Sequence, residues 1–117
     1  MSNANIIADK TKNFAIRIIK FAKHLHREGV DAIIVRQLLK SGTSIGANTR
    51  ESSNAQSKDD FIHKLSIALK EADETAYWLE LLVGAEEISQ KQFASLNSDL
   101  KEIIALLTAI IKTSKGI

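Results

Sequence analysis

Acidic and histidine side chains three residues apart could hold metal ions on one face of a helix. Carboxylate-bridged di-iron sites in helix bundles need two Glu-x-x-His motifs on different helices. This sequence has one comparable pair, Asp60 with His63, and no other histidine follows an acidic residue at that spacing. Glu71 and Glu74 have no histidine partner. We therefore predict no catalytic residue, no metal and no cofactor; a carboxylate metal site near Asp60 and His63, or at Glu71 and Glu74, is the enzymatic alternative.

Other catalytic motifs are missing from the sequence. The chain has no cysteine, which excludes a thiolate nucleophile, a disulfide framework, a zinc finger and an iron–sulfur cluster. Gly42 and Gly46 are not followed by the Lys-Ser/Thr pair of a phosphate-binding loop. No apolar run approaches the roughly 18 residues of a membrane span, and residues 1–5 lack the pattern of a signal peptide. We expect a soluble, cytoplasmic, non-enzymatic protein that does not bind membranes.

Basic side chains recur at helical spacing in the first half of the chain. Residues 1–50 carry a net charge of +6 and residues 51–117 one of −4, although the total is only +2. At about 100° per residue, these cations form a ridge on each of two successive helices, with small residues between them on the second. Such a surface attracts nucleic-acid phosphates, and no aromatic residue alternates with the cations to stack on bases; a solvated lysine-rich face is the alternative. The predicted nucleic-acid-binding residues are Lys12, Lys20, Lys23, Arg27, Arg36, Lys40 and Arg50.

Long helices are needed to position these residues. Apolar residues recur every three or four positions over four stretches, and the absence of proline leaves few sites for sharp turns. We predict an all-α, up-down-up-down antiparallel four-helix bundle in one domain, residues 1–117, with helices at 9–28, 31–54, 58–85 and 90–113. Residues 1–5 take no part in this fold. Two interior glycines, each costing about 1 kcal/mol relative to alanine, make a break near Gly42 the alternative to a continuous second helix.

The third predicted helix carries two heptad rows. One row, from Phe61 to Leu82, has the spacing of a bundle core. The second row steps by four and three residues on what we expect to be the opposite side of the helix. A monomer needs no outward tryptophan flanked by apolar residues, so this row predicts a subunit interface; scattered exposed apolar residues beside a loop-covered tryptophan are the alternative. The row consists of Ile67, Glu71, Glu74, Trp78 and Leu81.

Two segments go beyond a general helical pattern. They are SGTSIGAN at residues 41–48 with Glu51, and FIHKLSIALKEADETAYWLELL at residues 61–82. They resemble the bacterial 23S rRNA intervening sequence proteins, a family of small four-helix bundles without established catalytic activity, and the resemblance spans nearly the whole chain. The family motif on the second helix is matched by Ser44, Ile45, Asn48 and Glu51. We expect these residues to serve helix packing, with small neighbours permitting close approach and Asn48 fixing the register through a buried hydrogen bond.

The resemblance extends to accessory proteins of diversity-generating retroelements. Those proteins form barrel-shaped homopentamers whose basic surfaces contact nucleic acid and a reverse transcriptase. By this resemblance the present chain is a homopentamer, with the second row of the third helix as a subunit contact. We therefore expect a homo-oligomer that binds RNA or DNA weakly and without sequence specificity. The alternative is a scaffold for an RNA-processing or reverse-transcribing protein partner.

Overall fold

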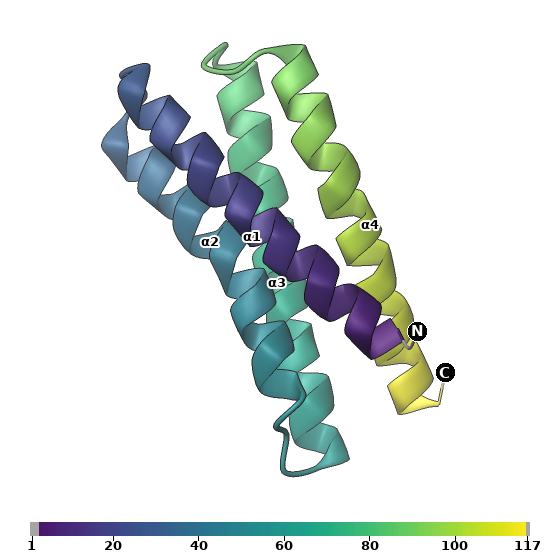
Figure 1. Ribbon diagram of the computed structural model, residues 1–117. Helices are drawn as coiled ribbons and strands as arrows, with labels where there is room; N and C mark the ends of the chain where they lie inside the picture. Colours follow the sequence, from purple (N-terminus) through teal and green to yellow (C-terminus); the bar gives the residue numbers. More distant parts are fainter. Residues whose placement is uncertain (1–2, 117) are drawn as a thin grey trace.

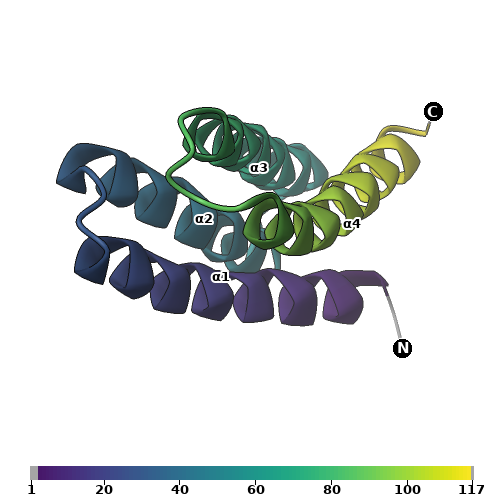
Figure 2. The ribbon, with the colours of Figure 1, turned by 90° about the horizontal axis from the view of Figure 1, so that it is seen from above.

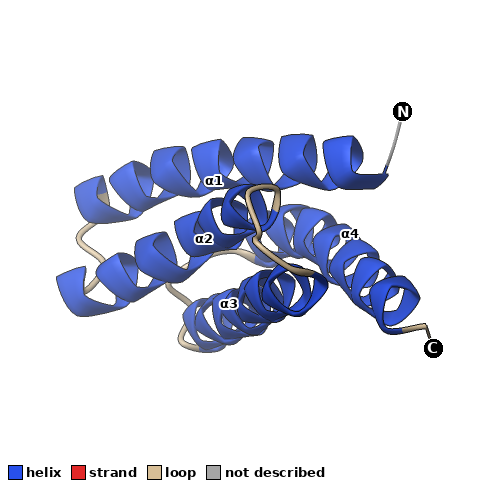
Figure 3. Ribbon diagram, turned by 90° about the horizontal axis from the view of Figure 1, so that it is seen from below, coloured by secondary structure: helices blue, strands red, loops and turns tan. Residues whose placement is uncertain are grey.

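The computed structural model describes residues 3–116, and over that range the chain forms four helices joined by short turns (Figure 1). The helices are α1 Asn3–Arg27, α2 Ala32–Ser52, α3 Lys58–Gly84 and α4 Gln90–Lys115. Because each connection is short, successive helices run antiparallel. The prediction of an all-α, up-down-up-down four-helix bundle is confirmed, and Figure 3 shows the helices and the loops that join them.

Side-chain caps set the start of three helices. The carboxylate of Asp31 accepts from the backbone N–H of Ile33 at 2.8 Å. The hydroxyl of Ser57 accepts from Asp60 N at 3.0 Å, and Ser89 forms a reciprocal capping box with Gln92. Each cap satisfies an N–H group that has no partner inside its helix, so each fixes where the helix begins.

The first helix begins six residues earlier than predicted. It starts at Asn3 rather than at residue 9, so the expectation that residues 1–5 lie outside the fold is wrong for the described part of that segment; residues 1 and 2 lie outside the described residues. Ile7 and Thr11 extend the buried face by two turns, at 2% and 1% exposure. Polar Thr11 interrupts the apolar pattern, but its hydroxyl donates to the carbonyl of Ile7 at 2.8 Å and can therefore be buried.

The remaining helix bounds agree with the prediction to within two residues, and the predicted core rows are mostly buried. Every member of the α3 row from Leu65 to Leu82 is buried. The large side chains that close the centre of the bundle come from all four helices. Phe61, the first member of the predicted row, is half-buried at the edge of the core.

The α2 helix is continuous through both glycines and packs closely on α1. A Cβ atom at Gly42 would lie 2.8 Å from Cγ2 of Ile18, and one at Gly46 would lie 3.2 Å from the backbone carbonyl oxygen of Thr11. At Gly42 any larger residue would displace Ile18, and at Gly46 the contact would be tight, so the close packing on α1 offsets the helix propensity that the glycines lose. The alternative of a break near Gly42 is therefore wrong.

The contact between α1 and α4 is much less extensive than that between α1 and α2. The two helices cross at an angle, and beyond the crossing the C-terminal half of α1 turns away from the start of α4 (Figures 1 and 2). The crossing is held by two ion pairs, Lys10 with Glu102 at 2.8 Å and Arg17 with Asp99 at 2.6 Å. The result is an open wedge between α1 and the first turns of α4.

Candidate nucleic-acid interface

The outer side of the α1–α2 pair is hollowed along its length. A cavity of about 750 Å³ lies between the C-terminal half of α1 and the N-terminal half of α2, and one of about 530 Å³ lies toward the other end of the same pair. Thr43 lines both cavities, so the two adjoin at this residue and are described together as one groove. We call it the basic groove because five of the seven predicted cations line it: Lys12, Lys23, Arg27, Arg36 and Arg50.

The floor of the basic groove is apolar or small, and its charges lie at the rim. Ile19 and Leu39 line the larger cavity together with short side chains, while Ala15 and Gly46 leave the smaller one open. Glu51 is the acidic residue that lines the groove, and it is paired with Lys64 of α3 at 3.0 Å. A bulky anion can therefore approach the cations without meeting an uncompensated carboxylate.

The two other predicted cations lie on different surfaces. Lys20 precedes Lys23 by three residues, which turns it about 60° around α1, and it lines the wedge facing α4. Lys40 lies toward α3, where its positive charge partly opposes the increase that burial causes in the pKa of the Glu71 carboxyl. The structure therefore divides the predicted ridges among three surfaces and brings only five cations together.

The second row of α3 lies beside the core and not opposite it. Each member precedes a core residue by one position, which corresponds to about 100° and not 180°. Trp78 is half-buried and packs against the core, and its indole Nε1 is enclosed without a hydrogen-bond acceptor among residues 3–116. Leu81 is 39% exposed, whereas Ile67, Glu71 and Glu74 are half-buried. The expectation of a row opposite the core is therefore corrected to a row beside the core, in which Glu71 lies within electrostatic reach of Lys40 on α2.

Within this row, the carboxyl of Glu71 has a raised pKa. Partial burial is the largest cause that raises the pKa of its carboxyl, and the neighbouring charge of Glu74 adds to the effect. Lys40 and Lys70 act in the opposite direction without cancelling it. The carboxylate of Glu71 is thus held in a less favourable environment than water.

The family-motif residues do not act as expected in one respect. Ile45 is fully buried, but Asn48 donates to the carbonyl of Ser44 in its own helix at 2.9 Å and does not set the register between helices. That role falls to a buried hydrogen bond between the hydroxyls of Thr75 and Ser41, 2.9 Å apart. The signal in the sequence was the threonine within the α3 core row, because a buried hydroxyl needs a partner.

Of the residues considered for metal binding, Asp60 forms a hydrogen bond in the turn before α3. Within residues 3–116, no three acidic or histidine side chains gather in an arrangement that could hold a metal ion. The carboxylate of Asp60 accepts from the backbone N–H of Gln56 at 3.2 Å and so supports the turn before α3. Among the described helices none combines the length and apolar character needed to cross a membrane.

Sequence and structure comparisons agree on the ancestry of this bundle. The profile of the 23S rRNA-intervening sequence proteins matches residues 3–109, almost the whole chain. The chain belongs to this family. The resemblance drawn from residues 41–51 and 61–82 is therefore confirmed. Comparison with curated proteins gives no match.

A solved structure shares the fold of this 23S rRNA-intervening sequence protein. It is a protein of unknown function from the S23 ribosomal protein family of Bacteroides thetaiotaomicron, 51% identical in sequence. The TM-score is 0.93, and the match covers 95% of this chain and 99% of the other. The likeness extends over all four helices, so the helices that form the basic groove are part of the shared fold.

Proposed function

We propose that this 23S rRNA-intervening sequence protein is a non-catalytic homo-oligomer that binds RNA or DNA along the basic groove. The observation that carries the proposal is the set of five cations along one groove whose acidic lining residue is already paired. No catalytic step and no cofactor is part of this function.

The dimensions of the groove suit a nucleic-acid backbone. From Lys12 to Arg27, α1 rises by about 22 Å at 1.5 Å per residue, a length comparable to about six phosphates of one strand at 3.4 Å each. The cations lie on exposed helix faces and can contact phosphates, and phosphate contacts carry no sequence information. Binding is therefore weak, independent of sequence and steeply dependent on salt, with a slope of about −4 in log K against log salt if all five cations bind phosphates.

Charge reversal within the groove tests this proposal. The double variant Lys23→Glu and Arg36→Glu should lower the affinity for a 20-nucleotide RNA or DNA more than tenfold in fluorescence anisotropy at 50 mM salt. The matched control is Lys112→Glu, on the exposed end of α4 outside the groove. An affinity unchanged by the double variant, or lowered equally by the control, would contradict the groove as the binding surface.

The assembly forms the second part of the proposal. Exposed Leu81 and Tyr77, at 39% and 53%, adjoin the half-buried Trp78 on α3 and support a subunit contact. A homopentamer is the assembly that we propose, and sedimentation velocity measures it. Trp78→Ala with Leu81→Ala should yield smaller species; a monomeric parent protein would overturn the proposed interface.

A second candidate function rests on the α3 surface that contains Tyr77, Trp78 and Leu81, which we call the Leu81 surface. If the Leu81 surface binds another protein instead of a second copy, the bundle acts as a scaffold for an RNA-processing or reverse-transcribing partner. Affinity purification after nuclease treatment distinguishes the two. A partner that is retained in the parent protein and lost with Leu81→Ala supports the scaffold, whereas loss of all partners on nuclease treatment supports nucleic-acid binding.

A further inference from the structure

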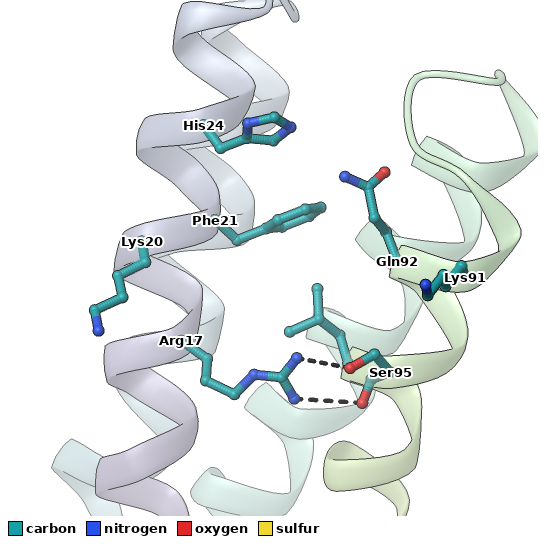
Figure 4. A pocket seen from close by; sticks show the side chains of 8 residues that line it. Arg17, Lys20, Phe21, His24, Lys91, Gln92 and Ser95 are labelled. Atoms are coloured by element: carbon teal, nitrogen blue, oxygen red, sulfur yellow. Dashed lines mark hydrogen bonds between the residues drawn. The ribbon is translucent and has the colours of Figure 1, made fainter.

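The wedge between α1 and α4 contains a cavity that the sequence did not predict. Its volume is about 510 Å³, within the range of small-molecule sites. Arg17 closes one end of it, donating to the hydroxyl of Ser95 at 2.8 Å and to the backbone carbonyl of Ser95 at 3.3 Å (Figure 4). Arg17 also donates to Asp99 at 2.6 Å. These bonds hold the two helices in a fixed relation beside the cavity, so the site is formed before any ligand enters.

One wall of this wedge pocket is aromatic. The rings of Phe21 and His24 point from α1 toward α4 and are stacked, with centroids 6.1 Å apart and planes 25° from parallel (Figure 4). Phe21 is half-buried, so part of its ring remains open to a planar ligand, and Leu96 of α4 adds apolar surface opposite. Phe21 thus lines the same pocket as Lys20, one of the predicted nucleic-acid-binding cations.

The polar groups of the wedge pocket are mainly donors. The side-chain oxygen of Gln92 accepts from Ser89 N at 2.8 Å in the capping box, which turns its amide nitrogen toward α1 (Figure 4). Lys20 and Lys91 are exposed and form no ion pair within residues 3–116, and the Lys20 side chain extends away from α4 (Figure 4). No carboxylate lines the pocket among the described residues. Such a site favours a flat ligand with hydrogen-bond acceptors and an anionic group.

We propose that the wedge pocket binds a single nucleotide, with the base stacked on Phe21 and the phosphate held by Lys91. A nucleobase supplies both the flat apolar face and the acceptor atoms that the amide of Gln92 can meet. A fatty acid would supply the anion but neither the flat face nor these acceptors. The inference takes its ligand class from the function proposed above, but its residues are separate from the basic groove.

Titration of the protein with adenosine 5′-monophosphate, followed by amide chemical shifts in NMR, tests the proposal. Shifts should concentrate in residues 17–24 and 91–96, and ribose 5-phosphate should bind at least tenfold more weakly because it lacks the base. Phe21→Leu keeps an apolar side chain but removes the stacking face and should weaken binding about tenfold. Lys91→Gln should weaken it several-fold, while the control Lys112→Gln should leave it unchanged.

Three results would overturn the wedge pocket as a nucleotide site. They are equal binding of ribose 5-phosphate, shifts centred on the α1–α2 groove, and no shift at 10 mM nucleotide. Thermal unfolding of Phe21→Leu tests whether a loss of nucleotide binding comes from loss of the fold. Lys91→Gln, at an exposed position, gives an independent measure of binding. Loss of RNA binding by the groove variants together with failure of the mononucleotide would reject only the pocket. Mononucleotide binding with unchanged RNA affinity in the groove variants would reject only the groove.

Discussion

The two sides of α1 pack in opposite ways. Toward α2, glycines bring the backbones so close that a single added methyl group would collide with Ile18, and the outer surface becomes a long groove. Toward α4, longer side chains and ion pairs keep the helices apart, and a shorter pocket forms beside Arg17. The closely packed α1–α2 pair thus forms a long surface that suits a nucleic-acid backbone. The wedge between α1 and α4 forms a shorter pocket that suits a single nucleotide.

Replacing Gly42 by valine should have the largest effect on this comparison. A Cβ at this position would lie 2.8 Å and 2.9 Å from two carbons of the Ile18 side chain, so the close α1–α2 contact must open. We expect a loss of about 2–3 kcal/mol in the free energy of unfolding, or roughly 10 °C in Tm, in urea or thermal unfolding.

Gly84→Ala is the control for that experiment. No atom lies within 4 Å of a Cβ built at Gly84, so alanine should stabilise the end of α3 by up to about 1 kcal/mol. Equal destabilisation by both variants would show that the glycines are not selected for the approach of α1 and α2.

Neutralising one lysine at a time tests which cations of the chain bind RNA in the groove. Lys23→Gln should lower RNA affinity several-fold and reduce the slope of log K against log salt by about one. Lys40→Gln should change the RNA affinity less than twofold, because Lys40 lies toward Glu71 on α3 and not in the groove. Equal effects in anisotropy titrations would indicate a diffuse positive surface in place of a defined groove.

Loss of the ion pair between Arg17 and Asp99 should lower the stability of the fold less than Gly42→Val does. The side chains of Arg17 and Asp99 are 40% and 47% exposed, so their ion pair is screened by water and contributes at most about 1 kcal/mol. We expect Asp99→Asn to lower Tm by a few degrees at 50 mM salt and by less at 500 mM salt. A loss as large as that of Gly42→Val would mean that the α1–α4 joint carries more of the fold than its contacts indicate.

The smallest expected effect concerns Glu71, on the flank where Lys40 lies. Its raised pKa means that the folded state holds its proton to higher pH than the unfolded state, so stability falls as pH rises from the usual value of 4.5 through the folded pKa. Glu71→Gln should therefore raise Tm by about 2 °C at pH 7 and have no effect well below pH 4.5. A destabilised variant at pH 7 would show that the carboxylate has a favourable partner after all.

Several features of the fold could be predicted because their cause is local. The caps at Asp31, Ser57 and Ser89 depend on residues two or three positions away. The start of α1 at Asn3 was missed because polar Thr11 interrupts the apolar pattern, although Thr11 is buried at 1% exposure. The hydrogen bond between Ser41 and Thr75 joins residues 34 positions apart, so no local pattern contains it.

The sequence by itself determined the class of protein. Apolar spacing, the absence of proline and cysteine, and two specific segments were sufficient for a four-helix bundle of the 23S rRNA-intervening sequence family, because helix periodicity and capping act over a few residues. Only the tertiary structure decided which cations share a surface, that Trp78 packs against the core, and that Phe21 lines a pocket with α4. These depend on how each helix is rotated and how far it lies from its neighbour, and packing between distant residues sets both.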